Sequence, residues 1–356
     1  MARTLEDLFG VNTLSGLVQL FAQGTAKNNT FASLFERRPE YVVRGNDTVG
    51  WDEISFTRKN AGFVDRDGNP VPTDPISKTK RSTSLASIKL SRTIKASELL
   101  RERELGTLNS PVIARSVIGR NVKELTEMIQ RSINTMCADA LQGSIAFDAT
   151  KYPYGEIVLP TVTYGVNTFT ATASWGTAGT KILSGSAELP SIRTTMREAC
   201  GEEPQRVIQA EAVQRYLLGN TEIQAWLQTT MPGLRVLSEG AIEAAGGIGG
   251  IPMWKTATDH YIDADGSVAY NLSGDKLIAL AGEPMLVLAE GHGVIPNSAI
   301  LAPRAEDLMP SFAPTPGFYS YAVADPRTGN IEVIVGWNGF PILLDPTRIT
   351  SADVTP

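Results

Sequence analysis

One long amphipathic helix constrains this chain more than any other segment, and the sequence predicts it between Ser110 and Gly143. Ser110-Pro111 is a helix start signal and Gly143 a stop signal. Apolar residues recur every three or four positions and form one stripe: Ile118, Val122, Leu125, Ile129, Ile133, Met136 and Ala140. The opposite face is polar and is expected to be wet: Arg120, Lys123, Glu124, Glu127, Gln130, Arg131, Asn134 and Asp139.

The composition is that of a globular protein large enough to bury a sizeable core. The chain has 356 residues, of which 42% are hydrophobic and 20% charged. Its two cysteines, Cys137 and Cys200, provide neither a disulfide framework nor a metal-ligand spacing, which favours a reducing compartment. We expect neither a secretion signal nor a membrane span, because no sufficiently long apolar run occurs.

Charge is distributed unevenly along the chain. Residues 1–105 hold 16 Lys and Arg against 13 Asp and Glu, which leaves 16 against 25 for residues 106–356. The sequence pI of about 5.2 argues against nucleic-acid binding as the main activity, since such proteins concentrate Lys and Arg at high pI. Complementary charges that meet between subunits would explain the uneven distribution equally well.

Two segments before the long helix look unstable on their own. Residues 1–45 are predicted to be an arm with a short, glycine-weakened helix and extended chain. Residues 46–96 are predicted to be a long basic hairpin, running out from Val49 to Ile54 and back from Ile88 to Ile94 around a proline-rich tip. A hairpin of this length is costly to order unless a partner surface receives it.

The remainder of the chain alternates between helical and strand patterns, as in a mixed α/β unit. A helix is predicted from Leu189 to Cys200, closed by Gly201, and is followed by a short buried strand at 206–210 and a helix at 211–218. Near the C-terminus, residues 331–346 are predicted to form a strand, a turn and a second strand, which together with residues 299–302 make the sheet under the long helix.

Catalytic motifs are not found in the sequence. There are two histidines, His260 and His292, and no nucleophile elbow, zinc-binding His-Glu-x-x-His or Cys-x-x-Cys motif. The glycine-rich run at 244–252 lacks the Lys-Ser/Thr of a phosphate-binding loop. We therefore expect no enzyme activity and no catalytic, cofactor or metal site. The alternative is a soluble two-domain α/β enzyme, which requires a pocket lined by His292 or by clustered acids.

The order of these parts resembles the major capsid protein E family of lambda-like tailed bacteriophages. The similarity spans nearly the whole chain and rests on the order and spacing of several phrases: Thr48-x-x-Trp51-Asp52-x-Ile54, Leu85 to Ile94, Gly250-Ile251-Pro252 through Tyr261-Ile262-Asp263, and Pro341 to Pro346. The resemblance implies an α+β protein with the HK97-type shell fold. It implies an N-terminal arm at 1–45, an extended loop (E-loop) at 46–96, a peripheral (P) domain at 97–183 that contains the long helix as its spine, an axial (A) domain at 184–300, and a return to the P-domain sheet at 301–356.

The resemblance also implies a function. The chain would self-assemble through hexamers and pentamers into an icosahedral head that encloses double-stranded DNA, without sequence-specific DNA binding or membrane contact. It would be assembled in the bacterial cytoplasm, with separate scaffolding, portal and decoration proteins as further partners. A cellular encapsulating shell with the same fold is the alternative. Candidates for contacts between subunits are Phe35, Trp51, Arg58, Lys59, Arg66, Lys78, Lys80 and Arg81.

Overall fold

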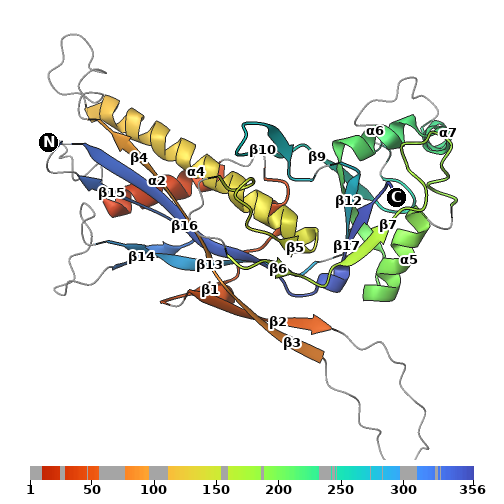
Figure 1. Cartoon of the computed structure of the whole chain (residues 1–356), viewed down its shortest axis with the longest axis horizontal. Helices are drawn as coiled ribbons and strands as arrows, with labels where there is room; N and C mark the ends of the chain where they lie inside the picture. The colour runs from red at the N-terminus through yellow and green to blue at the C-terminus, as the bar shows by residue number, and fades with distance from the viewer. Residues whose placement is uncertain are drawn as a thin grey trace, which may run out of the picture.

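In the computed structural model, helix α4 (Pro111–Leu141) lies along a six-stranded sheet, as the sequence predicts (Figure 1). The structure describes residues 10–24, 29–45, 47–55, 77–95, 111–153, 159–185, 188–231, 242, 245, 247–272, 274–282, 284–296, 311–324, 328 and 330–356. The predicted strand at 299–302 and the hairpin tip at 56–76 lie outside these ranges. The strands of the sheet are β1 (Val42–Val43), β4 (Ala86–Ile94), β13 (Leu286–Ile295), β14 (Ser311–Pro316), β15 (Phe318–Ala324) and β16 (Ile331–Leu343).

The apolar stripe of α4 is buried along its length, and Gly143 follows the helix with a φ of 102°. Part of the opposite face is buried as well, which corrects the prediction of a wet face. Gln130, Asn134 and Asp139 are only 6%, 1% and 5% exposed. These side chains are buried because other segments of the chain cover this side of the helix. Helix α2 (Val11–Gly24) and the hairpin of β10 (His260–Ile262) and β11 (Val268–Tyr270) both contact α4 or its flanks.

The prediction of a turn inside residues 331–346 is wrong, because β16 is one continuous strand of 13 residues. It pairs antiparallel with β4, β13 and β15. Its two glycines do not bend the chain. Instead they leave room for aromatic rings, since a Cβ on Gly336 would lie 2.4 Å from Cζ of Tyr319, and one on Gly339 would lie 2.3 Å from Cζ2 of Trp337.

The pairing of the basic hairpin also differs from the prediction. Strand β2 (Thr48–Ser55) pairs with β3 (Ser77–Ser84), whereas β4, predicted as its partner, runs on into the large sheet and pairs with β16. Both arrangements satisfy the alternation of polar and apolar residues. Burial decides between them, because Ala86 and Ile94 at the ends of β4 are 3% and 0% exposed.

A second sheet has the strand order β7-β17-β12-β8-β9 and carries three helices (Figure 1). The predictions of a helix closed by Gly201, a buried strand and a following helix are confirmed by α5 (Leu189–Cys200), β8 (Pro204–Ala210) and α6 (Glu211–Gly219). The other elements are β5 (Ser144–Ile145), β6 (Val162–Thr163), β7 (Asn167–Thr170), α7 (Thr221–Thr230), β9 (Met253–Ala257), β12 (Lys276–Ala281), β17 (Ile349–Asp353), and the 3-10 helices η2 (Ala32–Leu34), η3 (Pro39–Tyr41) and η4 (Pro346–Arg348).

Candidate assembly surfaces

The β2–β3 hairpin projects from the body, and one of its faces is fixed against the body (Figure 1). Trp51 is 5% exposed, and its ring centroid lies 6.4 Å from that of Tyr164. Arg81, opposite Trp51 in the register, forms an ion pair with Glu53 and donates from Nη1 to the carbonyl of Thr163 at 3.1 Å. Trp51 and Arg81 therefore hold the hairpin to its own chain.

The other face of the hairpin is directed outward. Lys78 and Lys80 are both exposed and lie opposite Ile54 and Asp52. Because side chains alternate between the two faces of a strand, these four residues share the face that Trp51 does not use. This face carries two lysines, one aspartate and one isoleucine, and it is the strongest described candidate for a contact with another subunit.

The remaining predicted contact residues fall into two groups. Arg58, Lys59 and Arg66 lie outside the described residues. Phe35 is 7% exposed and belongs to the hydrophobic core of its own chain, as does Trp51. The structure thus brings Lys78 and Lys80 together on one surface and places Phe35 and Trp51 inside the subunit.

The described part of the arm is anchored by two buried polar side chains. Asn134 of α4 accepts hydrogen bonds from the backbone N–H groups of Phe31 and Ala32 at 3.0 and 2.9 Å. Its amide nitrogen donates to Asp259 at 2.9 Å, and the same carboxylate oxygen accepts from the N–H of Thr30 at 2.8 Å. Asn134 and Asp259 therefore connect the arm, the long helix and the strand region before β10.

A second anchor of the arm is the ion pair between Arg37 and Glu290 of β13, with Nε 2.9 Å from Oε1. The Glu290 side chain is 10% exposed, and Gly317 gives it room, since a Cβ there would lie 2.6 Å from its Cδ. Burial raises the pKa of Glu290, and the neighbouring Arg37 opposes that rise only in part.

Replacing Glu290 with Gln is expected to change how stability depends on pH. A carboxyl whose pKa is raised in the folded state stabilises the fold fully below its ordinary pKa of 4.5, and this contribution is lost as pH rises through the raised value. The melting temperature of Glu290→Gln should therefore rise relative to that of the unchanged chain as the pH increases above about 4.5. Circular-dichroism melts at several pH values measure this, and parallel curves would contradict it.

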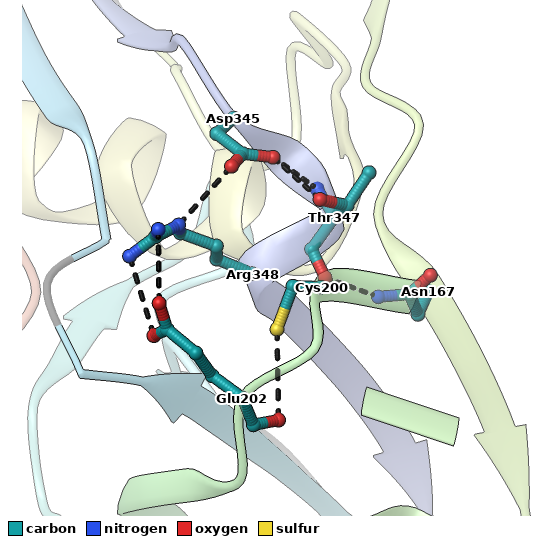
Figure 2. A network of polar contacts seen from close by, with 6 residues as sticks. All are labelled: Asn167, Cys200, Glu202, Asp345, Thr347 and Arg348. Atoms are coloured by element: carbon teal, nitrogen blue, oxygen red, sulfur yellow. Dashed lines mark hydrogen bonds and ion pairs between the residues drawn. The ribbon is translucent and has the colours of Figure 1, made fainter. Parts of the chain in front are cut away.

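A polar network occupies the joint where the chain passes from the large sheet into the second sheet, as Figure 2 shows. Asp345, which follows β16, is 3% exposed and accepts from the N–H and hydroxyl of Thr347 at 3.2 and 2.5 Å. Asn167, beside β17, donates to the carbonyl of Thr347 at 2.7 Å. The short helix η4 is thus fixed from both sheets.

Arg348 completes this joint by contacting two acids. Its Nε donates to Oδ2 of Asp345 at 3.1 Å, and its Nη2 lies 3.0 Å from Oε1 of Glu202 (Figure 2). Glu202 follows α5, a helix of the second sheet, so one guanidinium links the end of β16 to that helix. A planar guanidinium with several fixed donors suits such a double contact.

Two cavities occur beside the arm. One of about 330 Å³ lies between the arm and α4, with Phe35 and Gln130 in its wall, and one of about 670 Å³ lies along β8 and β9. Neither is lined by a His or a carboxylate among the described residues. His292 instead donates from Nδ1 to the carbonyl of Ala313 at 2.8 Å. Within the described ranges, no group of three His, Cys, Asp or Glu is placed to hold a metal ion. No described helix is both long and apolar enough to cross a membrane.

Several solved structures share this architecture. A putative capsid protein of a prophage from E. coli CFT073 is 14% identical with a TM-score of 0.54, over 96% of this chain and 99% of that one. A phage-related protein from Bordetella bronchiseptica RB50 is 12% identical with a TM-score of 0.53, over 97% and 98%. The mature capsid of bacteriophage PhiM1 is 10% identical with a TM-score of 0.50, over 93% and 88%. These similarities confirm the predicted HK97-type fold.

A match to a protein-family model identifies the family of this chain. The model described as phage major capsid protein E matches residues 29–300, which is more than half of the chain. A comparison with curated protein sequences gave no significant match. The family match favours a phage capsid over a cellular encapsulating shell. The chain therefore belongs to the phage major capsid protein E family and is a structural protein of the capsid.

Proposed function

We propose that copies of this chain assemble through hexamers and pentamers into an icosahedral head that encloses double-stranded phage DNA. The observation that carries the proposal is the family match over residues 29–300. The projecting hairpin supports it, because an exposed basic face on a two-stranded element suits a contact with another subunit. A closed shell requires each copy to bind several identical neighbours through different surfaces.

The charge of the chain suits a container for DNA. The net charge is -6 at pH 7, with the excess of acids in residues 106–356. A wall that neutralised many phosphates would hold the genome and resist its release. We infer that packaged DNA touches the inner face without sequence-specific binding. We also infer that the shell is assembled in the host cytoplasm, and that scaffolding, portal and decoration proteins are separate chains.

We further propose a division of the subunit by sheet membership. Residues 46–96 contain the E-loop hairpin, although β4 at its end belongs to the large sheet. The P-domain consists of α4 and the large sheet, including β13, and the A-domain consists of the second sheet, including β17. The division at residues 184, 300 and 301 suggested by the resemblance therefore changes, because β7 and β17 join the second sheet and β13 joins the large sheet.

Electron microscopy of the purified chain tests this function. Expression in bacteria followed by sedimentation should give closed shells tens of nanometres across, roughly the size of a phage head built from many subunits of this fold. The matched control is a chain that lacks residues 48–84, which removes both strands of the hairpin and leaves β4 in the large sheet. A stable monomer of the full chain under all assembly conditions, with or without co-expressed scaffold, would contradict the proposal.

A further inference from the structure

A groove lined by cationic side chains runs between the arm and the second sheet. It consists of the two cavities of about 330 and 670 Å³ beside the arm, which adjoin because Thr30, Ser33 and Lys255 line both of them. Thr30 and Ser33 belong to the arm, whereas Lys255 and Arg206 belong to β9 and β8. Arg37 lines the smaller cavity. This space, the arm groove, thus carries three cations along its length.

Arg206 and Lys255 lie on the same face of the second sheet. Strands β8 and β9 are parallel, and the register pairs Arg206 with Met253 and Ile208 with Lys255. Paired residues of neighbouring strands share a face, as do residues two apart in one strand. Because strands lie about 4.8 Å apart and rise about 3.3 Å per residue, the Cα atoms of Arg206 and Lys255 are about 8 Å apart. Both cations can therefore contact one ligand.

Among the described residues, no carboxylate is placed to neutralise Arg206 or Lys255. Neither forms an ion pair with a described Asp or Glu, and no described acid lines either cavity. Asp259 contacts the arm, but it is only 3% exposed, and its Oδ2 already accepts from the N–H of Thr30 and from Nδ2 of Asn134. Two cations that share a cavity without an acid repel each other, so the arm groove favours an anionic occupant.

Carboxylates suit the arm groove better than the phosphates of a nucleic acid. Proteins that bind single strands stack the bases on aromatic rings. The aromatic residues in these walls are covered, since Phe35, Trp254 and Phe318 are 7%, 4% and 5% exposed. A cavity of about 670 Å³ holds a few amino-acid residues but not a duplex.

An extended peptide presents carboxylates at the required spacing. Alternate side chains of an extended chain lie on one face about 7 Å apart, close to the separation of Arg206 and Lys255. Met253, on the same face and 47% exposed, offers an apolar contact to the aliphatic part of such side chains. No described strand of this chain has two carboxylates on one face, so the described part of a second copy offers no such segment.

From this geometry we propose that the arm groove binds an extended acidic segment of a different protein. Two alternate carboxylates of the segment pair with Arg206 and Lys255, and the segment passes the hydroxyls of Thr30 and Ser33. Because it contacts the arm and the second sheet at once, the segment fastens the arm to that sheet. The site goes beyond the proposed function, since it requires neither closed shells nor DNA.

Calorimetric titration of the full chain with a synthetic peptide tests this site. The probe is Glu-Thr-Glu-Thr-Glu, blocked at both ends, and the matched control is Gln-Thr-Gln-Thr-Gln. The acidic peptide should bind in 50 mM salt at least about fivefold more tightly than in 500 mM salt, because salt screens the ion pairs. Equal binding of the two peptides, or of neither, would overturn the proposal. Tighter binding of a five-residue oligothymidylate would assign the groove to nucleic acid instead. A stoichiometry that falls as the protein concentration is raised would assign it to a second copy.

Substitutions in the groove provide the second test. Arg206→Gln and Lys255→Gln should each weaken binding of the acidic peptide by about fivefold. Lys181→Gln is the control for lost charge, since Lys181 is exposed and lies outside both cavities, and it should stay within about twofold of the unchanged chain. Equal effects of Lys255→Gln and Lys181→Gln would overturn the proposal.

A change on the arm side tests the groove without removing a cation. Ser33→Glu should weaken peptide binding by about tenfold or more, because the new carboxylate repels the peptide and pairs with the cations opposite, whereas Ser33→Ala should stay within about twofold. Circular-dichroism melts of each variant verify that it is folded. Unchanged binding by Ser33→Glu would show that the arm is not part of the site. Failure to form shells would overturn the proposed function alone, because peptide binding is measured on the single chain.

Discussion

Replacing Arg348 with Met is expected to lower the free energy of unfolding by about 3 kcal/mol, the lower end of the cost of breaking a buried ion pair. The change leaves the carboxylate of Asp345, which is 3% exposed, without its cationic partner. The hydrogen bonds from Thr347 remain and reduce the loss. The pair with Glu202 contributes little, because that side chain is 41% exposed and is screened by solvent.

Urea denaturation followed by tryptophan fluorescence measures this change. Arg197→Met is the matched control, since Arg197 forms an ion pair with Glu203 at a site where its own side chain is 56% exposed. The control should lose less than about 1 kcal/mol. A second variant, Asp345→Asn with Arg348→Met, should recover part of the loss, because no buried charge is then left unpaired. Equal effects of Arg348→Met and Arg197→Met would show that the joint does not depend on the buried pair.

Replacing Asn134 with Leu is expected to have a comparably large effect, about 3 kcal/mol or more. The leucine side chain has the same number of heavy atoms and the same branching but offers no polar atom to the N–H groups of Phe31 and Ala32, which bond to Asn134. The carboxylate of Asp259 loses one of its two donors as well. Each buried polar group left unpaired costs about 1–3 kcal/mol. Water cannot replace the lost partner easily here, because Phe31 and Asp259 are only 0% and 3% exposed.

The effect of Asn134→Leu should concentrate in the arm. Hydrogen exchange of residues 29–35 should accelerate by a larger factor than that of β16, because the anchor of the arm is lost while the sheet keeps its own pairing. Arg131→Leu is the control on the same helix, since Arg131 is exposed, and it should change stability by less than about 0.5 kcal/mol. Uniform exchange across the subunit would argue against a local anchor.

The long helix and the α5–β8–α6 series were predictable because their signals are local. Pro111, Gly143 and Gly201 mark helix ends through their own backbone preferences, and the apolar stripe needs only the helical period. The buried state of Asn134 and Asp139 was not predictable in the same way. A helical wheel shows that they oppose the stripe, but it contains no information about the arm and hairpin that cover them.

The errors in the strands have a related cause. The pattern of β4 fits a hairpin partner and a sheet strand equally well, so the choice depends on contacts with β16, distant in the sequence. Gly336 and Gly339 look like turn residues, yet they serve close approach of Tyr319 and Trp337. The sequence did contain a signal for the two faces of the basic hairpin, one bound to the body and one directed outward. Val49 and Trp51 occupy alternate positions of β2 and therefore lie on one face of the strand.

The position of β17 in the second sheet determines when this sheet can be completed during synthesis of the chain. This strand, residues 349–353, lies between β7 and β12, and it pairs with residues 167–170 on one side and 276–280 on the other. A nascent chain on the ribosome therefore has a gap in the middle of this sheet until residue 353 has been synthesised. Contacts between residues so far apart also form slowly. The complete second sheet, and every surface of the subunit that depends on it, therefore becomes available only after residue 353 has been synthesised.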